Sequence, residues 1–497
     1  MKLSKLIEGI DVKRRINFRD LNLSGVSMDS RSIKEGELFV AVKGSSVDGH
    51  DFVDEASVRG ASALIVDREI DSGLPVIIVD DTVPAGSEVA RRFYGEPDLK
   101  LELIGVTGTN GKTSTAFLLQ SILERSVGKT GIIGTVGFGM GGEISESERT
   151  TPDPVNLFRI MAGFIDAGCT AAVMEVSSHA MIQGRIHGVE FDAGVFTNIT
   201  RDHLDYHGTF ENYVGAKEMF ASTLNEPGRH KKPGILVYNV DDSVVAGIGG
   251  RFEGRKVSYG RDPGSDVRAE MIDADLRGTR IGIRTGDGSI DLELKLLGSF
   301  SAYNATAAAA TASSLGIDLD HIKDGLEAVG SVAGRFQVVG AEGGPVVIVD
   351  YAHTPDALEN LLSFCRELSP ERIITVFGCG GDRDRGKRPI MGRIAADISD
   401  RVYITDDNPR TEDPQLIVDE IMSGVRGSDT PCTVIRDRKE AIERSIHEAG
   451  DRDLVVIAGK GHETYQVTAV GKVPFSDLAE AEKALGSRGG ERPSRLS

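Results

Sequence analysis

The apolar positions of this chain gather in short runs, and stretches with helical periodicity separate most of them. Continuous apolar runs are typical of strands buried on both faces, as in a parallel sheet covered by helices. The alternation therefore predicts an α/β fold. The rhythm of the runs divides the chain into three blocks and a tail.

The N-terminal block, residues 1–97, has apolar runs at 37–42, 63–66 and 75–79. A helical pattern follows at 85–94 and ends at Gly95, a residue type that often closes helices. This block is predicted to be a small α/β domain.

The central block, residues 98–333, opens with an apolar run at 101–106. Further runs of the buried-strand type lie at 171–176, 193–196 and 235–238. Helical patterns separate them, which predicts a doubly wound parallel sheet. The alanine-rich segment 298–315 favours a helix that packs closely on a neighbour.

The C-terminal block, residues 334–485, repeats strand and helix, with apolar runs at 346–349, 373–377, 402–404 and 454–457. It predicts a second open sheet, with a Rossmann-like α/β architecture. The tail, residues 486–497, is rich in Gly, Arg and Ser and is expected to be disordered.

Composition narrows the function classes. A chain of 497 residues exceeds what one hydrophobic core usually serves, which agrees with several domains. The formal net charge of −19 argues against a general nucleic-acid or membrane-surface binder. Cys169, Cys365, Cys379 and Cys432 have no metal-type spacing and fit buried thiols in a reducing compartment. With no apolar stretch long enough to span a bilayer, a cytoplasmic protein is expected.

A phosphate-binding loop is predicted directly after the run at 101–106. Its residues are Gly108, Thr109, Asn110, Gly111, Lys112, Thr113 and Ser114. In such a loop, backbone N–H groups face phosphate oxygens, a lysine meets the β and γ phosphates, and a Ser or Thr binds magnesium. Val106 stands where the usual pattern has glycine, so the loop is a variant. A glycine-rich turn without a ligand is the structural alternative.

Polar side chains follow the other strands of the central block, where ligands of open α/β sheets gather. Glu175 follows one strand and is a candidate magnesium ligand. His203 follows the next and is a candidate for a metal or phosphate role, whereas Asp205 and His207 remain ambiguous. Lys217 lies in a helical pattern, and its residue type alone predicts an unmodified surface lysine.

Four charged clusters follow strands of the C-terminal block, at 349–355, 378–388, 406–410 and 459–463. Their mixed charges would suit a zwitterionic ligand, whose carboxylate meets arginine and whose ammonium meets Asp or Glu. The alternative for any one cluster is a solvated loop.

The order of these motifs resembles the Mur ligase family, the ATP-dependent amide-forming enzymes of peptidoglycan synthesis. The resemblance covers nearly the whole chain, including the loop at 108–113 and the segments 298–304, 334–336 and 350–353. It implies that Asn304, Arg335 and Asp350 contact ATP. It also implies a monomer that acts on a UDP-N-acetylmuramoyl dipeptide.

Segments 28–31, 149–152, 203–217 and 407–410 resemble the members that add meso-diaminopimelate as the third residue. That amino acid has a second carboxylate, which a guanidinium can bind with two hydrogen bonds, so Arg410 is predicted to set the selectivity. By resemblance, the amino-acid site contains Arg383, Asp407, Asn408, Pro409, Arg410, Gly459 and Glu463. Glu463 would suit the ammonium.

The resemblance also assigns the UDP-linked substrate. Met28, Ser30, Ser45, Ser46 and Val47 would contact the UDP part, and Thr150, Thr151, Ser177, Gln183 and Arg185 the muramoyl dipeptide. Many relatives have Asn where this chain has Arg149, so that contact stays open.

The resemblance implies two magnesium ions and a modified lysine. Thr113 and Glu175 would hold one ion, while His203 and Lys217, carried as an N6-carboxylysine (a carbamate), would hold the other. A carbamate is an anion with two oxygens, whereas an ammonium would repel the metal. Lys112, His203, Lys217 and Arg335 are the predicted catalytic residues. A lysine-adding Mur ligase, a folylpolyglutamate synthase and a noncatalytic nucleotide-binding protein remain the alternatives.

Overall fold

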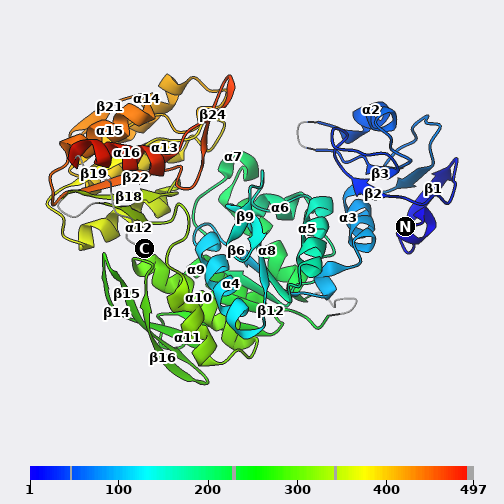
Figure 1. Ribbon diagram of the computed structural model, residues 1–497, viewed down its shortest axis with the longest axis horizontal. Coiled ribbons are helices and arrows are strands. Elements are labelled where there is room, and N and C mark those ends of the chain that lie inside the picture. The colour runs from blue at the N-terminus through cyan, green and yellow to red at the C-terminus, as the bar shows by residue number, and fades with distance from the viewer. Residues whose placement is uncertain (45–46, 226–230, 341–343, 490–497) are drawn as a thin grey trace.

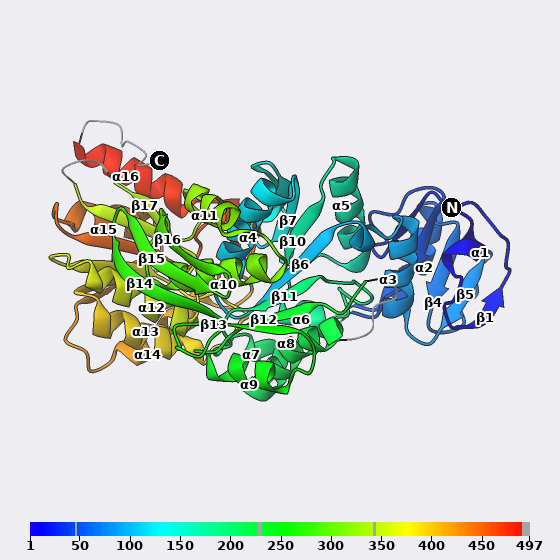
Figure 2. The same ribbon diagram turned by 90° about the horizontal axis from the view of Figure 1, so that it is seen from below.

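Three large sheets, one in each block, lie in a row with the central sheet between the other two (Figure 1, Figure 2). The computed structural model describes residues 1–44, 47–225, 231–340 and 344–489. Each sheet lies within one predicted block, so the architecture agrees with the predicted α/β fold. The exact domain boundaries stay predictions.

The N-terminal sheet has the order β1-β5-β4-β3-β2, in which β2 to β5 are parallel and β1 is antiparallel. Its strands are β1 (Val12–Ile16), β2 (Gly25–Ser27), β3 (Glu37–Val40), β4 (Ala63–Val66) and β5 (Val76–Val79). The helices are α1 (Leu3–Leu6), α2 (Val53–Val58) and α3 (Thr82–Phe93), with short 3-10 turns at Gly49–Phe52 and Pro97–Leu99. Gly95 follows α3 with φ +77°, as the helix-ending glycine predicts.

The central sheet has the order β16-β15-β14-β13-β12-β11-β6-β10-β7-β8-β9. Its strands are β6 (Glu102–Thr107), β7 (Thr130–Gly134), β8 (Gly137–Met140), β9 (Glu143–Ser145), β10 (Ala171–Glu175), β11 (Ala193–Phe196), β12 (Ile235–Asn239), β13 (Lys256–Gly260), β14 (Val267–Asp275), β15 (Gly278–Thr285) and β16 (Gly288–Leu294). The neighbours β14, β13, β12, β11, β6, β10 and β7 pair in parallel. Antiparallel pairing adds β15 and β16 at one edge and β8 and β9 at the other.

Helices cover both faces of the central sheet. They are α4 (Lys112–Ser126), α5 (Pro154–Asp166), α6 (Ser178–Ile182), α7 (Leu204–His207), α8 (Phe210–Asn225), α9 (Ser243–Arg251), α10 (Ser299–Ser314) and α11 (Leu319–Ala328). Along β10, Ala171 and Val173 pack with the α4, α10 and α11 side, while Ala172 and Met174 pack with the opposite face. This alternation explains why the strand reads as a continuous apolar run. The alanine-rich helix α10 is buried against α4, as its small side chains predict.

The C-terminal sheet has the order β17-β18-β22-β19-β20-β21, parallel except for the edge strand β17. Its strands are β17 (Gln337–Val339), β18 (Val346–Asp350), β19 (Ile373–Phe377), β20 (Arg401–Ile404), β21 (Cys432–Val434) and β22 (Leu454–Ala458), and a hairpin of β23 (Tyr465–Thr468) and β24 (Gly471–Pro474) follows. The helices are α12 (Pro355–Glu367), α13 (Lys387–Ile398), α14 (Pro414–Val425), α15 (Arg438–Glu448) and α16 (Asp477–Gly489).

Helix α16 corrects one sequence expectation. It continues through Gly489, so the first part of the segment 486–497 is helical where disorder was expected. Residues 490–497 lie outside the described part of the chain. All four cysteines are free thiols. Within the described ranges, none of the helices combines the length and apolar character needed to cross a bilayer.

A buried ion pair joins the first residues of α15 and α16 in the C-terminal block. The Arg438 guanidinium donates to both carboxylate oxygens of Asp477 at 2.7 and 2.8 Å, and neither side chain is exposed. We expect Asp477→Ala to lower the free energy of unfolding of this block by about 3 kcal/mol, because a buried guanidinium loses its counterion. Urea denaturation followed by circular dichroism measures the change.

Asp397→Ala is the matched control, because Asp397 pairs with Arg393 on the exposed face of α13 in the same block. Its effect should stay below about 0.5 kcal/mol. Equal losses from the two variants would contradict the importance given to burial.

Candidate active site

The predicted phosphate loop joins the end of β6 to the first turn of α4. Gly108 has φ +148° and Gly111 has φ +85°, backbone conformations that favour glycine. A Cβ on Gly111 would also collide with the side-chain oxygen of Asn304. Val106 is a buried residue of β6, so the strand continues where the usual motif has its first glycine. The loop therefore presents its backbone at a helix N-terminus, as phosphate binding requires.

Lys112 and Asn110 hold this loop in shape. Lys112 Nζ donates to the carbonyl oxygens of Gly108 at 3.0 Å and Thr109 at 2.9 Å. The Asn110 backbone N–H donates to Asn198 Oδ1 at 2.9 Å, beyond the end of the neighbouring strand β11. Ser114 lies half-buried in the first turn of α4.

Glu175, at the end of β10, lies against the same helix turn. Thr113 Oγ1 donates to Glu175 Oε1 at 3.0 Å. Thr135 donates to the two carboxylate oxygens, through its N–H at 2.8 Å and its hydroxyl at 3.0 Å. Sequence reasoning missed Thr135, because β7 before it was not recognised as a strand. The carboxylate is thus fixed by three donors beside the phosphate loop.

The C-terminal block contacts the loop at two points. Arg335 donates to Thr113 Oγ1 at 3.0 Å, and its guanidinium stacks over the Tyr351 ring at 4.7 Å. Asn110 Nδ2 donates to Asp356 at the start of α12 at 2.7 Å. The predicted reach of Arg335 toward the phosphate loop is therefore present in the geometry.

Asp350 and Asn304 lie at the edges of this region. Asp350 accepts the backbone N–H groups of Phe336 and Ala352, each at 2.7 Å, and burial raises the pKa of its carboxyl group. Asn304 Oδ1 accepts the Thr115 hydroxyl at 3.4 Å, which places α10 directly beside α4.

Lys217 is a buried residue of α8, not a surface lysine, with 2% of its surface exposed. Its ammonium donates to the Gly108 carbonyl at 2.7 Å and lies 4.8 Å from the centre of the Tyr213 ring. Burial lowers its pKa well below the usual value, and the charge of Lys112 lowers it further. The amine therefore gives up its proton more readily than an exposed lysine does.

His203 lies beside Asp202, with 3.3 Å between Nε2 and Oδ2, and adopts a left-handed backbone with φ +53°. Burial lowers its pKa to about 3, so its imidazole is neutral at pH 7, the form that binds metals. Of the two ambiguous residues, His207 packs against the same Tyr213 ring as His203, whereas Asp205 makes no such ring contact. His207 hydrogen-bonds Ser178 at 2.9 Å, and Asp205 is exposed.

The predicted dipeptide-binding residues of the central block form one continuous group. Thr150 Oγ1 lies 3.2 Å from Thr135 Oγ1, and Thr151 Oγ1 donates to the Glu175 carbonyl at 2.8 Å. The Ser177 N–H donates to Thr151 Oγ1 at 3.1 Å. Arg185 donates to the Thr151 carbonyl at 2.8 Å and to Gln183 Oε1 at 3.0 Å. Burial lowers the pKa of Arg185 to about 10.

The predicted UDP-binding residues lie in the N-terminal block. Ser30 is buried, with 3.3 Å between its hydroxyl and Glu55 Oε2, Met28 is half-buried, and Val47 is exposed. Ser45 and Ser46 lie outside the described residues. Arg149 is exposed, and its charge acts on Asp29 as well as on Arg185, so it stands between the two predicted parts of this site.

The predicted amino-acid site gathers at the end of the C-terminal sheet. Arg410, with φ +53°, donates to the Gly381 carbonyl at 2.7 Å, while Arg383 donates to the Asp382 carbonyl at 2.9 Å. Burial and the charge of Arg383 lower the pKa of Arg410. Two guanidinium groups therefore face one region, as an anionic ligand would require.

Asn408 links the motif at 407–410 to the segment at 459–463. Its side chain donates to Glu463 at 2.9 Å and accepts from Lys460 at 3.0 Å. Gly459 has φ +122°, and a Cβ there would come within 2.7 Å of the buried Asp407. Pro409 completes the turn by accepting the Glu412 N–H at 3.2 Å.

Lys460 is a residue that sequence reasoning missed. It is fully buried and donates to Glu463 at 2.7 Å, so this carboxylate already has a cationic partner. Lys460 lies between Gly459 and Gly461, and a lysine flanked by two glycines does not indicate a buried position.

Comparisons with known proteins agree with this arrangement. The Mur ligase family, catalytic domain matches residues 22–93, the Mur ligase middle domain matches 106–312, and the Mur ligase glutamate ligase domain matches 334–461. A solved structure titled as a UDP-N-acetylmuramoyl-L-alanyl-D-glutamate--2,6-diaminopimelate ligase is 31% identical, with a TM-score of 0.68 over 98% of this chain and 99% of that chain. A MurF ligase from Thermotoga maritima in complex with ADP has the same fold, with a TM-score of 0.65 at 20% identity over 95% of this chain and 100% of that chain.

Two relatives carry the same name as the first of these structures. The protein from Bacillus licheniformis is 42% identical over 98% of this chain and 99% of its own length. The protein from Geobacillus kaustophilus is 43% identical over 94% of this chain and 96% of its own length. At this identity over nearly the full length, the chain belongs to the Mur ligase family.

Proposed function

We propose that this chain is an ATP-dependent ligase that joins meso-diaminopimelate to the D-glutamate side-chain carboxylate of UDP-N-acetylmuramoyl-L-alanyl-D-glutamate. The reaction belongs to peptidoglycan synthesis. The main support is the position of Arg335, which joins the phosphate loop to the block that carries Arg383 and Arg410. The relatives named for this reaction support the choice of substrates.

The reaction would proceed in two steps. The D-glutamate carboxylate attacks the γ-phosphorus of ATP and forms an acyl phosphate with release of ADP. The amine of meso-diaminopimelate then attacks the acyl carbon, and the tetrahedral intermediate expels phosphate to leave an amide. Loop N–H groups, Lys112 and Arg335 would hold the phosphates, so positioning and electrostatics would supply most of the rate. Asn304 and Asp350 would complete the ATP site.

The side chains near the loop fit magnesium. Thr113 and Glu175 bring two oxygen donors within 3.0 Å of each other, and magnesium prefers oxygen ligands while keeping several waters. In the described ranges, no three His, Cys, Asp or Glu side chains form a metal cluster, so phosphate oxygens and water would complete the shell. Bound magnesium would neutralise charge on the transferring phosphoryl group.

A second ion would lie between His203 and Lys217. Both side chains pack around Tyr213, and the His203 imidazole is in its neutral form. The Lys217 amine, with its lowered pKa, would react with carbon dioxide to give a carbamate, and the resulting anion would face the nearby positive charge of Lys112.

Each substrate would be bound by its own set of residues. Arg410 and Arg383 would bind the far carboxylate of meso-diaminopimelate, with Asp407, Asn408, Pro409, Gly459 and Glu463 around its ammonium. The UDP part would contact Met28, Ser30, Ser45, Ser46 and Val47, and the dipeptide Thr150, Thr151, Ser177, Gln183 and Arg185. We also propose a cytoplasmic location, which the free thiols support, and a monomer, which the family resemblance implies.

Phosphate release with ATP and UDP-N-acetylmuramoyl-L-alanyl-D-glutamate tests the reaction. We expect release with meso-diaminopimelate, little with L-lysine and none without amino acid. Lys112→Ala should reduce turnover at least about a hundredfold with an unchanged circular dichroism spectrum, because the phosphates lose their cation. A preference for lysine would overturn the specificity. No phosphate release with any amino acid would favour a noncatalytic nucleotide-binding protein. Turnover of folate in place of the UDP-linked substrate would favour a folylpolyglutamate synthase.

Selectivity should depend on Arg410. We expect Arg410→Ala to lower kcat/KM for meso-diaminopimelate at least about thirtyfold, because one carboxylate loses a charged hydrogen-bond partner. The weak activity with lysine should change much less. Arg393→Ala, on the exposed face of α13, is the control. Parallel losses for both amino acids would mean that Arg410 supports the fold of the loop and not recognition.

The modification of Lys217 can be observed without turnover. Protein incubated with ¹³C-bicarbonate should show a carbamate carbon signal by NMR, and Lys217→Arg should lack it because a guanidinium does not react with carbon dioxide. A wild-type spectrum without this signal, or a signal that persists in the variant, would contradict the proposed modification.

A further inference from the structure

An ion pair joins the central block to the loop that carries Arg383. Arg201, just before Asp202 and His203, donates to Asp384 through Nε at 3.2 Å and through its terminal nitrogen at 3.5 Å. Asp384 is the residue after Arg383. Its side chain is 8% exposed, against 45% for that of Arg201. The contact therefore joins the predicted amino-acid site to the segment that contains a predicted metal ligand.

The local backbone is shaped for this contact. Asp384 Oδ1 also accepts the Gly386 N–H at 2.8 Å, which fixes the carboxylate at the turn before α13. A Cβ on Gly386 would collide with the Arg201 guanidinium, so the absence of a side chain leaves room for the arginine. The carboxylate is thus held from two directions, by Arg201 and by the Gly386 N–H.

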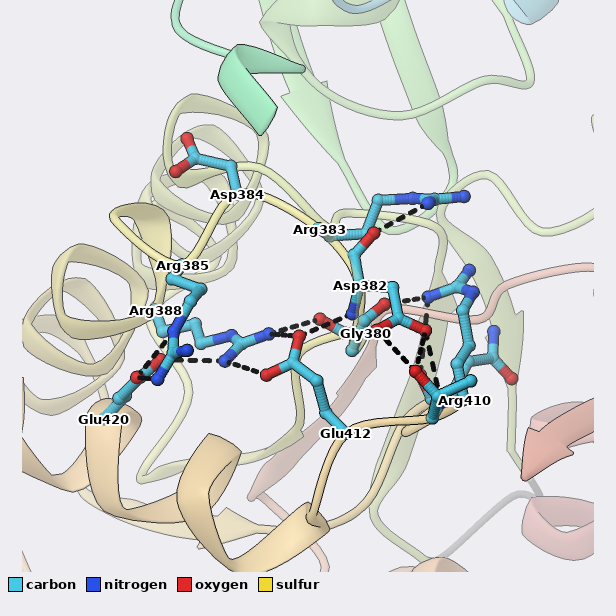
Figure 3. A network of polar contacts seen from close by, with 12 residues as sticks. Gly380, Asp382, Arg383, Asp384, Arg385, Arg388, Arg410, Glu412 and Glu420 are labelled. Atoms are coloured by element: carbon cyan, nitrogen blue, oxygen red, sulfur yellow. Dashed lines mark hydrogen bonds and ion pairs between the residues drawn. The ribbon is translucent and has the colours of Figure 1, made fainter. Parts of the chain in front are cut away.

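The other side of the same loop is tied to the segment that carries Arg410. Buried Arg388 donates to Glu412 at 2.8 and 3.0 Å, to Glu420 at 2.7 Å and to the Gly380 carbonyl at 3.0 Å. Glu412 also accepts the Asp382 N–H at 2.5 Å. Figure 3 shows the Asp384 carboxylate pointing away from the group formed by Arg388, Glu412 and Glu420. The loop is therefore held on one side by Arg388 and on the other by the contact between Asp384 and Arg201.

Charge on the central side supports the same contact. Lys387, at the start of α13, lies close enough to Asp202 of the central block for their opposite charges to interact. Opposite charges therefore face each other across the boundary at more than one position.

We propose that Arg201 and Asp384 are positioning residues that hold the amino-acid loop against the site of acyl-phosphate formation. This inference rests on the proposed ligase function. The closed arrangement is the one that the structure shows, in which Arg201 contacts Asp384 and Arg335 contacts Thr113. The pair favours this arrangement, in which Arg383 and Arg410 would present the incoming amine. Exposed ion pairs contribute little, but this one is a two-nitrogen contact to a buried carboxylate.

The test separates the substrates. Asp384→Asn removes the charge but keeps an oxygen for the Gly386 N–H, and Arg201→Ala removes the other partner. Each should raise KM for meso-diaminopimelate roughly fivefold and lower kcat, because fewer molecules occupy the closed state. KM for the UDP-linked dipeptide should change by less than about twofold, because its predicted residues belong to the N-terminal and central blocks and lie away from the ion pair.

A double variant, a conservative variant and a control variant complete the experiment. The double variant Arg201→Ala/Asp384→Asn should be no worse than either single one, because both remove the same interaction. Arg201→Lys should recover part of the loss. Arg251→Ala, which breaks the exposed pair with Glu218 inside the central block, should match the wild type.

The outcomes that contradict the positioning role differ from the one that contradicts the ligase function. Unchanged KM for meso-diaminopimelate in folded Asp384→Asn, additive losses in the double variant, or equal increases in KM for both substrates would each overturn the positioning role while leaving the ligase intact. A wild-type chain without phosphate release that depends on meso-diaminopimelate would overturn the proposed function first, and this inference with it.

Discussion

The hydroxyl of Thr113 is the contact on which the arrangement of the site depends. It donates to Glu175 and accepts from Arg335, so one oxygen joins a helix N-terminus, the end of a central strand and the C-terminal block. Glu175 can approach so closely because Gly134, on the adjacent strand, has no Cβ. Removing the hydroxyl would leave a buried carboxylate and a guanidinium without their shared partner, and the two blocks would lose a direct link.

Parallel topology explains why residues distant in sequence reach this contact. Strands β7, β10, β6 and β11 are neighbours in the central sheet, so the segments after them meet at one edge. There lie Thr135, Glu175, the phosphate loop and the segment with His203. The C-terminal sheet repeats the principle with β18, β22, β19 and β20, which bring Asp350, Lys460, Arg383 and Asn408 together. The two edges face each other, and Arg335, Asn110 and Arg201 cross between them.

Much of this could be predicted from the sequence, and the limits have physical causes. Strands buried on both faces read as continuous apolar runs, so β10, β11 and β19 were predicted almost to the residue. Strands β15 and β16 alternate buried and exposed positions, a weaker signal, and the antiparallel extension of the central sheet was missed. The position of the loop at 108–113 between a strand and a helix was predictable from its glycines and the apolar run before it, while its phosphate-binding role stays a prediction.

Burial of charged side chains was the least predictable property. Lys217 lies in an ordinary helical pattern, and only the fold places its amine under the phosphate loop. Lys460, Thr135 and the pair Arg201 and Asp384 likewise acquire their contacts from segments far away along the chain. A single sequence records residue types and spacing but not which distant surface will cover them.

The contact between Arg335 and Thr113 has a consequence for biosynthesis. The two residues are separated by 222 positions, so the ribosome completes the phosphate loop long before it adds the arginine. Because domains generally fold as units, N-terminal ones first, an unfinished chain can contain a formed phosphate loop without the block that completes it. Such a chain has the loop at 108–113 but lacks Arg335 and the whole C-terminal sheet, so the contacts between the two blocks form only when synthesis is nearly complete.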